Sequence, residues 1–182
     1  MKKFAVAASG NGSNLQVMID AGFKPVAVLS NKEEAFALQR AKAANIPAFH
    51  IDPKNDEQII KILKDSGAEF LFLAGYLQKI SPAVINALPI YNIHPALDLH
   101  KFGGKGMYGI HVHKAVIDSG ELFTGATIHR VDENYDEGAI LRQTPPVKVE
   151  PSDTPQILQA KVLAEEHKLV VDFLDEFNKI TR

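Results

Sequence analysis

The sequence predicts an α/β fold: a single three-layer, Rossmann-like domain with a mostly parallel twisted sheet, an antiparallel edge and helices on both faces. Two observations predict this class. Through the first half of the 182-residue chain, short apolar runs alternate with segments of helical spacing, as in successive right-handed β–α–β crossovers. Later in the chain, two alternating runs flank an acidic turn, which indicates an antiparallel hairpin at one edge of the sheet.

The composition favours one compact domain. With 182 residues, 46% hydrophobic and 23% charged, the chain can bury one substantial core, so we expect a single domain over residues 1–182. No segment approaches the roughly 18 apolar residues of a membrane span. Met1-Lys2-Lys3-Phe4 leads directly into strand-like sequence, without the features of a signal peptide. We therefore expect a cytoplasmic protein with no membrane partner.

Cysteine content and net charge exclude further classes of protein. The chain has no cysteine, which excludes disulfides and thiolate metal sites. Its formal net charge of −2 argues against a nucleic-acid surface, which requires a basic stripe. We expect no metal and no nucleic-acid partner.

Four apolar runs in the first half predict parallel strands. Phe4–Ala8 is short and wholly apolar, as a central parallel strand requires, and Glu69–Leu73 is nearly so and is also placed centrally. The remaining elements of this half are strands over residues 25–29 and 46–50 and helices over about 33–44 and 56–64. His50, at the end of the third strand, is expected to have no role.

The glycine-rich turn Ser9–Asn14 follows the first strand and precedes a helical segment that starts at Leu15. This geometry directs backbone N–H groups and the positive end of a helix dipole toward an anion, and Ser13 or Asn14 is the expected N-cap. Leu15 stands where a dinucleotide fingerprint has its third glycine, and the region where its acidic ribose ligand is expected offers Ser30, Asn31 and Lys32 instead. The turn therefore predicts a site for a single phosphate monoester; a plain strand-to-helix turn is the alternative.

Asn92-Ile93-His94-Pro95 is the main catalytic candidate. The run Ile90–Ile93 predicts a short buried strand, so Asn92 and His94 project from the same face. Pro95 ends the strand and leaves His94 at its carboxyl end, where open α/β sheets hold their ligands. The alternative is a polar pair that neighbouring loops satisfy.

Two loops flank this strand. The mostly apolar segment Ala74–Ile80 precedes a helix that Ser81 caps and Pro82 starts, and it could wall a flat ligand or belong to the core. The glycine-rich segment 96–108 predicts a long loop of the kind that forms lids or is disordered. Its lysines, Lys101 and Lys105, could meet an anionic ligand or be solvated.

The His111-Val112-His113 pair has no third ligand at matching spacing, so we expect a helix start here that runs on through Lys114–Asp118 rather than a metal site. Farther on, Thr124–Val131 alternates like a strand, with Thr127, His129 and Val131 on one side. The acidic turn 132–138 follows, and could chelate a hard cation or be solvated. A returning strand is predicted over 139–149 and a last helix over about 156–178, capped by Asp153-Thr154-Pro155.

In this order and spacing, four segments together resemble the folate-dependent formyltransferases, and within them the branch that acts on 5-phosphoribosylglycinamide in purine biosynthesis. The matching segments are S-G-N-G-S-N-L-Q at 9–16, L-A-G-Y-L-Q-K-I-S-P at 73–82, N-I-H-P at 92–95 and D-E-N-Y-D-E-G at 132–138. The resemblance covers essentially the whole chain and implies 10-formyltetrahydrofolate as co-substrate, with small-molecule partners only. A monomer and a homodimer are both compatible with it.

The resemblance also implies the site residues. Asn92 and His94 correspond to the family's catalytic asparagine and histidine, and Asp136 to its aspartate. The implied binding residues are Gly12, Ser13 and Asn14 for the substrate phosphate, Glu166 for the ribosyl group, and Leu77, Gln78, Lys79, Ile80, Asn92 and the backbone of 131–136 for the folate. The N-terminal half would then bind phosphate, and the C-terminal half would bind folate and carry the catalytic set.

Some positions depart from the family pattern. The segment after His94 lacks the usual second proline, a glycine-rich insertion precedes His111, and Gln78 replaces a common arginine. These departures concern the lid and the folate tail rather than the catalytic set. Formyltransferases with an additional regulatory or transfer-RNA-binding domain are disfavoured by the length of the chain.

The residues suit formyl transfer, which passes through a tetrahedral oxyanion. The Asn92 amide and a protonated His94 would donate to that oxygen, and His94 would pass a proton to the departing folate nitrogen. Asp136 would favour the charged imidazole and hold a water that carries the amine proton. The alternatives are a formyltransferase for an amino-sugar nucleotide and a non-catalytic phospho-ligand domain; a dinucleotide oxidoreductase is least favoured.

Overall fold

A computed structural model describes residues 2–134 and 136–179 and contains a seven-stranded and a two-stranded sheet. The strands are β1 (Phe4–Ala7), β2 (Ala27–Ser30), β3 (Ala48–His50), β4 (Phe70–Leu73), β5 (Ile90–His94), β6 (Phe123–Thr124), β7 (Thr127–Arg130), β8 (Ile140–Gln143) and β9 (Val147–Lys148). The helices are α1 (Ser13–Asp20), α2 (Phe36–Ala43), α3 (Asp56–Asp65), α4 (Pro82–Ala87), α5 (Leu99–Phe102), α6 (Ile110–Asp118) and α7 (Pro155–Lys179).

The large sheet has the strand order β3-β2-β1-β4-β5-β7-β8. Its first five strands are parallel, whereas β7 is antiparallel to β5 and β8 is antiparallel to β7. This confirms the predicted mostly parallel sheet with an antiparallel edge, and β4 is its middle strand. The chain leaves β1 toward β2 and later returns to β4 on the other side of β1, so a topological switch point lies at the carboxyl ends of β1 and β4, where α/β sheets bind ligands.

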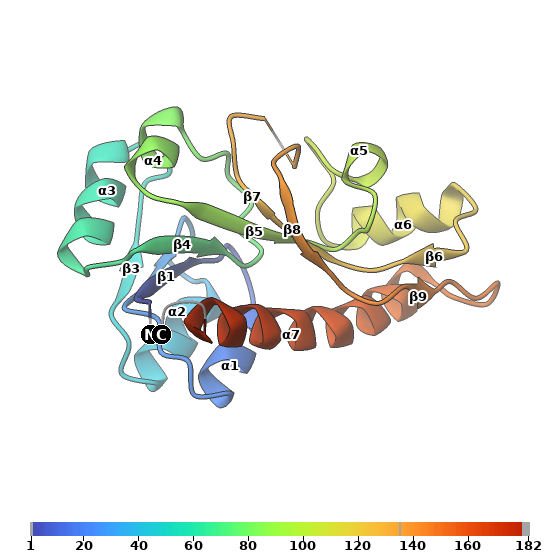
Figure 1. Cartoon of the computed structure of the whole chain (residues 1–182), viewed down its shortest axis with the longest axis horizontal. Coiled ribbons are helices and arrows are strands. Elements are labelled where there is room, and N and C mark those ends of the chain that lie inside the picture. Colours follow the sequence, from blue (N-terminus) through green and yellow to red (C-terminus); the bar gives the residue numbers. More distant parts are fainter. Residues whose placement is uncertain (1, 135, 180–182) are drawn as a thin grey trace.

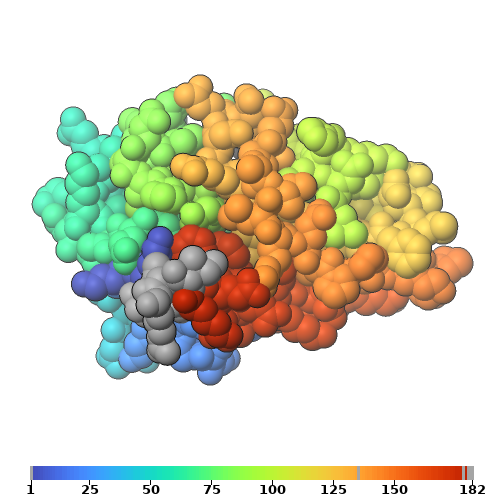
Figure 2. All heavy atoms as spheres, in the orientation of Figure 1, coloured from blue at the N-terminus to red at the C-terminus, as the bar shows by residue number. Residues whose placement is uncertain are grey.

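Two apolar cores cover the two faces of this sheet, so the domain has three layers (Figure 1). Side chains alternate along each strand. In β4, Phe70 and Phe72 join the core formed with α1, α2 and α7, whereas Leu71 and Leu73 join the core formed with α3 and α4. The helix α7 packs its apolar face on the first of these, as predicted, and in Figure 2 its red surface lies beside the orange surface of the β7–β8 segment.

Local signals placed the α3 and α4 helices correctly. The Asn55 side chain accepts a hydrogen bond from Gln58 N at the start of α3, and Ser81 Oγ accepts one from Val84 N ahead of Pro82. Such caps satisfy N–H groups that the helix leaves unpaired. In the part of the chain that the structure describes, no helix is both long and apolar enough to cross a membrane.

The predicted N-cap of α1 was wrong. Gly12 occupies that position with a φ of 72°, and no side chain caps the helix. A Cβ atom at Gly12 would lie 2.7 Å from the Ala37 Cβ. The close approach of α2 and the left-handed backbone therefore require glycine at this position.

Four other expected segments differ from the structure. The helix predicted from residue 33 begins at Phe36, and the long 96–108 loop contains the short helix α5, which Asp98 caps through Lys101 N. The hairpin strands 124–131 and 139–149 are each broken, which separates β6 from β7 and β8 from β9. Gly125 makes one break because it packs against Leu97 and Thr144, and Pro145-Pro146 makes the other because proline lacks an N–H for the ladder.

Candidate active site

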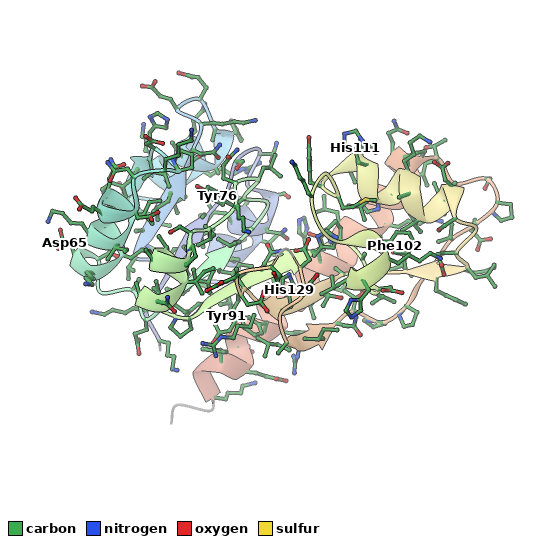
Figure 3. All side chains as sticks on the ribbon, turned by 90° about the horizontal axis from the view of Figure 1, so that it is seen from above. Asp65, Tyr76, Tyr91, Phe102, His111 and His129 are labelled. Atoms are coloured by element: carbon green, nitrogen blue, oxygen red, sulfur yellow. The ribbon has the colours of Figure 1, made fainter. Side chains whose placement is uncertain are left out.

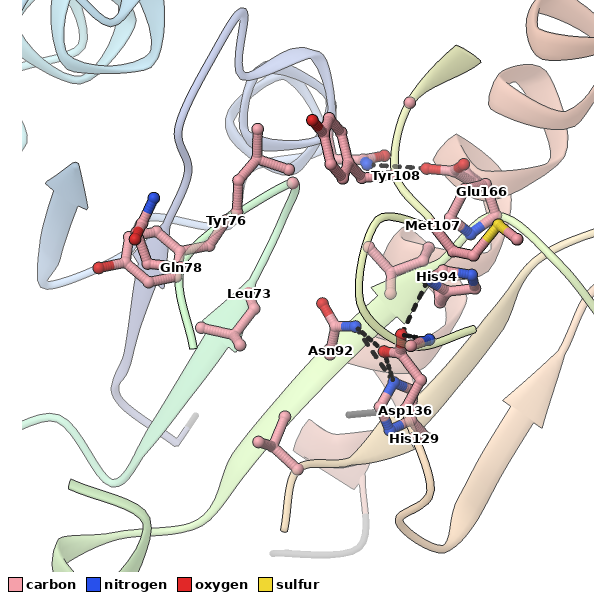
Figure 4. A pocket seen from close by; sticks show the side chains of 18 of the residues that line it. Leu73, Tyr76, Gln78, Asn92, His94, Met107, Tyr108, His129, Asp136 and Glu166 are labelled. Carbon is pink, nitrogen blue, oxygen red and sulfur yellow. Dashed lines mark hydrogen bonds and ion pairs between the residues drawn. The ribbon is translucent and has the colours of Figure 1, made fainter. Parts of the chain in front are cut away.

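A cavity of about 870 Å³ opens at the carboxyl ends of β1, β4 and β5. All the singly named predicted site residues except Gly12 line it, and Gly12 is buried in the turn before α1. From the predicted 131–136 segment, Val131, Asp132, Asn134 and Asp136 line it. In Figure 3, Tyr76 lies on one side of this region and Phe102 and His111 lie on the other, with His129 between them. The close-up in Figure 4 shows Asn92, His94, Asp136 and His129 grouped at the cavity wall.

Asp136 is the centre of this group. Its Oδ1 accepts a hydrogen bond from Asn92 Nδ2 at 3.2 Å and lies 3.2 Å from His129 Nε2, and its Oδ2 accepts one from Gly104 N at 2.9 Å. Burial alone would raise the pKa of this carboxyl. The His129 hydrogen bond, the His94 charge and the Gly104 N–H outweigh burial and hold the pKa below its ordinary value. Asp136 is therefore a carboxylate at neutral pH.

His94 is 4% exposed and has a neighbour at each ring nitrogen. Nε2 lies 2.7 Å from the Phe102 carbonyl oxygen, which can only accept, so Nε2 carries a hydrogen. Nδ1 faces Asp136 Oδ2 at 3.6 Å, within ion-pair distance but too far for a hydrogen bond. Burial lowers the pKa of His94, while the Asp136 charge and the Phe102 carbonyl act in the opposite direction.

The short segment 102–104 contacts two of the three catalytic candidates, His94 and Asp136, through its backbone. Phe102 O binds His94 and Gly104 N binds Asp136. The intervening Gly103 leaves no room for a side chain, because its Cβ would lie 2.4 Å from Leu99 O and 2.8 Å from Asp136 Cβ. This glycine-rich insertion therefore supports the site through main-chain groups.

Asn92 is held through its amide nitrogen. In Figure 4 this nitrogen points toward Asp136 and His129, and the amide oxygen points away from them. The distances from Nδ2 are 3.2 Å to Asp136 Oδ1 and 3.1 Å to His129 Nε2. Because an ionised carboxylate has only acceptor oxygens, the NH₂ end of the Asn92 amide, and not its oxygen, must face Asp136.

His129 belongs to this group, although the sequence pattern suggested no role for it. It lies on β7 directly opposite Asn92 and is 1% exposed. Its Nδ1 donates to Arg130 O at 3.0 Å, which leaves Nε2 facing Asn92 and Asp136. The sequence did contain one signal for His129: the predicted antiparallel edge strand is largely buried, and a buried polar side chain in it needs polar partners, which the neighbouring strand β5 supplies.

His113, which the sequence pattern suggested only as half of a rejected metal pair, is a second residue of the cavity wall. It lines the cavity from α6, is 2% exposed, and its Nδ1 has no hydrogen-bond partner among the described residues. Burial and the nearby His94 lower the pKa of His113 to about 4, so the ring is neutral at pH 7. His111 is exposed and packs edge-on against Tyr108, so the two histidines of this helix do not act together.

On the opposite side of the cavity, the Leu77–Ile80 segment is bound to the glycine turn. The buried Ser9 hydroxyl accepts a hydrogen bond from Leu77 N at 2.9 Å and donates one to Asn31 Oδ1 at 2.6 Å. Burial, with the Asp52 charge, raises the pKa of the neighbouring Tyr76 to about 12, so this ring is neutral. The Leu77–Ile80 segment therefore forms a partly apolar wall of the cavity, and the Ser9 hydroxyl fixes its position relative to the glycine turn.

Asn14 and Glu166 join the glycine turn to α7. Asn14 Nδ2 donates to Glu166 Oε2 at 3.0 Å, and Asn14 Oδ1 is buried without a partner among the described residues. Burial raises the pKa of Glu166 to about 7, although the Asn14 hydrogen bond opposes this shift. Both side chains line the cavity, so this corner offers an unused acceptor and a titrating carboxyl.

A family model described as formyl transferase matches residues 2–174. The chain belongs to the formyl transferase family. It is 41% identical to the chloroplastic phosphoribosylglycinamide formyltransferase of Arabidopsis thaliana over 188 residues, which cover 94% of this chain and 63% of that protein. It is 35% identical to the phosphoribosylglycinamide formyltransferase of Haemophilus influenzae over 184 residues, which cover 93% of this chain and 84% of the relative.

Solved structures of the family share the fold. The phosphoribosylglycinamide formyltransferase of Bacillus halodurans superposes with a TM-score of 0.84 at 31% identity and covers 95% of both chains. Glycinamide ribonucleotide transformylase 1 of Symbiobacterium toebii gives a TM-score of 0.85 at 31% identity, over 94% of this chain and 85% of that one. The chain spans about three fifths of the length of the plant relatives it matches.

The buried carboxyl of this formyl transferase family member makes stability depend on pH. Because the folded-state pKa of Glu166 lies near 7, above the ordinary 4.5, the folded state holds its proton longer than the unfolded chain does. This contribution to stability is fully present below pH 4.5 and is lost as the pH rises to about 7. The variant Glu166→Gln keeps an acceptor for Asn14 and is expected to be more stable than wild type at pH 8.5, by on the order of 3 kcal/mol.

Thermal unfolding at pH 4.5 and pH 8.5 tests this expectation. The stability gain of Glu166→Gln should be present at the higher pH and should largely vanish at the lower one. Glu165→Gln is the matched control, because Glu165 is paired with Lys168 on the outside of α7. An equal gain at both pH values would contradict the role of the buried charge.

Proposed function

We propose that this chain transfers the formyl group of 10-formyltetrahydrofolate to the amine of 5-phosphoribosylglycinamide, a step of de novo purine (IMP) biosynthesis. The observation that carries the proposal is the grouping of Asn92, His94 and Asp136 at the wall of one cavity. The glycine turn and the Leu77–Ile80 wall border the same cavity, so a phosphate group and a flat, partly apolar ligand can meet at this set. A cavity of about 870 Å³ is in the size range of small-molecule sites.

In the proposed reaction, the amine nitrogen forms a bond to the formyl carbon, and the bond from that carbon to the folate nitrogen then breaks. The amine loses one proton and the folate nitrogen gains one. Negative charge develops on the formyl oxygen, where positioned donors stabilise the tetrahedral intermediate most. The Asn92 amide N–H is proposed as one such donor; because Nδ2 faces both Asp136 Oδ1 and His129 Nε2 in this structure, the amide must release its contact with His129 to reach the formyl oxygen.

His94 is proposed as the second donor and as the acid for the folate nitrogen. Since Nε2 is bound to Phe102 O, Nδ1 is the ring nitrogen left for the reacting groups. Asp136 lies 3.6 Å from Nδ1 and favours its protonated form. The same carboxylate can hold a water that takes the proton from the attacking amine.

The binding roles follow from the walls of the cavity. We assign the substrate phosphate to Gly12, Ser13 and Asn14 at the N-terminus of α1 and the ribosyl group to Glu166. The formyl-folate is assigned to Asn92 and to Leu77, Gln78, Lys79 and Ile80. The backbone of 131–134 and 136 would complete the pterin pocket; Tyr135, also assigned to it, lies outside the described residues.

The proposal treats residues 1–182 as one formyltransferase domain, with a phosphate-binding N-terminal half and a folate-binding, catalytic C-terminal half. All proposed site residues come from one chain, so the site is complete in a monomer and in a homodimer alike. The proposed compartment is the cytoplasm. No metal and no nucleic acid takes part in the proposed reaction.

Turnover by the purified protein tests the proposal. With both substrates, the change in folate absorbance should show formyl transfer, and His94→Ala should lower its rate by about 100-fold or more. The exposed His50 provides the control variant His50→Ala, which should retain wild-type activity. Absence of turnover in the wild type, or full activity in His94→Ala, would contradict the proposal.

The same assay separates the alternatives. If the true acceptor is an amino-sugar nucleotide, that compound supports turnover in place of 5-phosphoribosylglycinamide. A non-catalytic phospho-ligand domain shows thermal stabilisation by phosphate that survives in His94→Ala, and no formyl transfer with either acceptor.

A further inference from the structure

Arg40, on α2, binds the glycine turn although it does not line the cavity. Its Nε donates to Asn11 O, its Nη2 donates to Asn11 Oδ1 and its Nη1 donates to Gln16 Oε1, each at 2.9 Å. Phe36, one helical turn earlier, lies against the guanidinium with 4.6 Å between Cζ and the ring centroid. Three of the five N–H groups of Arg40 are therefore directed at the turn and the helix that follows it.

The helix α2 contacts the glycine turn at a second point. Ala37 N donates to Gly10 O at 3.1 Å, and the Ala37 side chain occupies the space beside Gly12. The turn is thus held by backbone and side-chain contacts from one helix. Ser9 and Asn14 at the two ends of the turn are held by other segments, so α2 fixes its central residues, Gly10, Asn11 and Gly12.

The glycine turn also lacks a charge to match a phosphate. Ser9–Asn14 contains neither lysine nor arginine, and the first turn of α1 adds none. Arg40 supplies a cation in direct contact with this turn. The buried Asn14 Oδ1, which has no partner among the described residues, independently indicates that a ligand with a hydrogen-bond donor completes this corner of the cavity.

We infer that Arg40 is a positioning residue for the phosphate of the substrate: its guanidinium holds Asn11 and brings positive charge to the glycine turn. This inference rests on the proposed function for the identity of the substrate. The planar guanidinium is essential to it, because lysine has a single ammonium group that cannot bind Asn11 O, Asn11 Oδ1 and Gln16 Oε1 in one fork.

A comparison of two acceptors tests the inference. One acceptor is 5-phosphoribosylglycinamide and the other is the same riboside without its phosphate. With saturating formyl-folate, Arg40→Gln should raise KM for the phosphorylated acceptor by about 10- to 100-fold, as expected for the loss of charge-assisted contacts. Its kcat/KM for the riboside and its KM for formyl-folate should stay within about threefold of wild type. Arg40→Lys should recover only part of the loss.

Lys42→Gln is the matched control, because it removes the same charge from the exposed side of the same helix. It should behave as wild type with both acceptors. An equal loss on both acceptors in Arg40→Gln would overturn the inference and assign Arg40 a purely structural role, and so would an unchanged KM. If the wild type turns over neither acceptor, the proposed function fails by itself. Thermal stabilisation by inorganic phosphate then decides the inference: it should be lost in Arg40→Gln and kept in Lys42→Gln, and stabilisation of Arg40→Gln equal to wild type would overturn it.

Discussion

Asp136→Asn is expected to lower kcat by about 10³- to 10⁴-fold while leaving the fold intact, the scale of effect that follows replacement of a buried carboxylate beside a catalytic histidine by its amide. The carboxylate accepts from two fixed donors, Asn92 Nδ2 and Gly104 N. An asparagine in its place has one acceptor oxygen and one amide nitrogen, so one of the two donors must face another donor. The variant therefore loses both the orientation of Asn92 and the negative charge next to His94.

The pH dependence of kcat in Asp136→Asn distinguishes loss of the charge beside His94 from a general disturbance of the folded structure. Asp136 favours the protonated form of His94, and burial disfavours it. Without the carboxylate the pKa of His94 falls further, so the alkaline decline of the residual activity should move to lower pH. Glu137→Gln removes the same charge from the next, exposed residue and should retain wild-type kcat. A kcat of Asp136→Asn within tenfold of wild type would remove Asp136 from the catalytic set.

Gly138→Ala is expected to destabilise the protein by on the order of 3 kcal/mol and to displace the acidic loop. A Cβ at this position would lie 1.7 Å from Arg130 O and 2.8 Å from Arg130 C, both backbone atoms. Arg130 N also donates to Ala139 O at 2.9 Å, so the two strands cannot separate without breaking the ladder. Since Asp136 lies two residues earlier, activity should fall together with stability.

Denaturant unfolding of Gly138→Ala measures the first effect. Gly10→Ala serves as the stability control, because no atom lies within 4 Å of a Cβ built there. It should unfold close to wild type. If Gly138→Ala is as stable as this control, the tight contact between residue 138 and β7 is not a constraint of the folded protein.

Residues with strong local signals were placed correctly from sequence. The central strands are wholly apolar, α4 begins at a serine followed by a proline, and Asn92 and His94 share a strand face because their spacing is two. The grouping of Asp136 with this pair was implied by the resemblance of the acidic loop to a known family. The structure brings Asp136 within reach of both side chains.

The features that the sequence analysis missed depend on contacts between distant segments. Gly12 takes the N-cap position because α2 packs against it, which no property of residues 9–16 records. His129 has a polar setting only because β7 pairs in register with β5. Phe102 and Gly104 make their contacts through backbone atoms, so the types of these two residues do not indicate the contacts.

The hydrogen bond between Asn14 and Glu166 joins residues 152 positions apart. During synthesis, the segment that carries Glu166, 152 positions after Asn14, must leave the ribosome before α7 can dock on α1 and close that corner of the cavity. The glycine turn therefore forms this corner of the cavity only after α7 has been made. A nascent chain that lacks α7 also lacks the apolar residues with which this helix covers one face of the sheet, so the corner of the cavity beside Asn14 stays open.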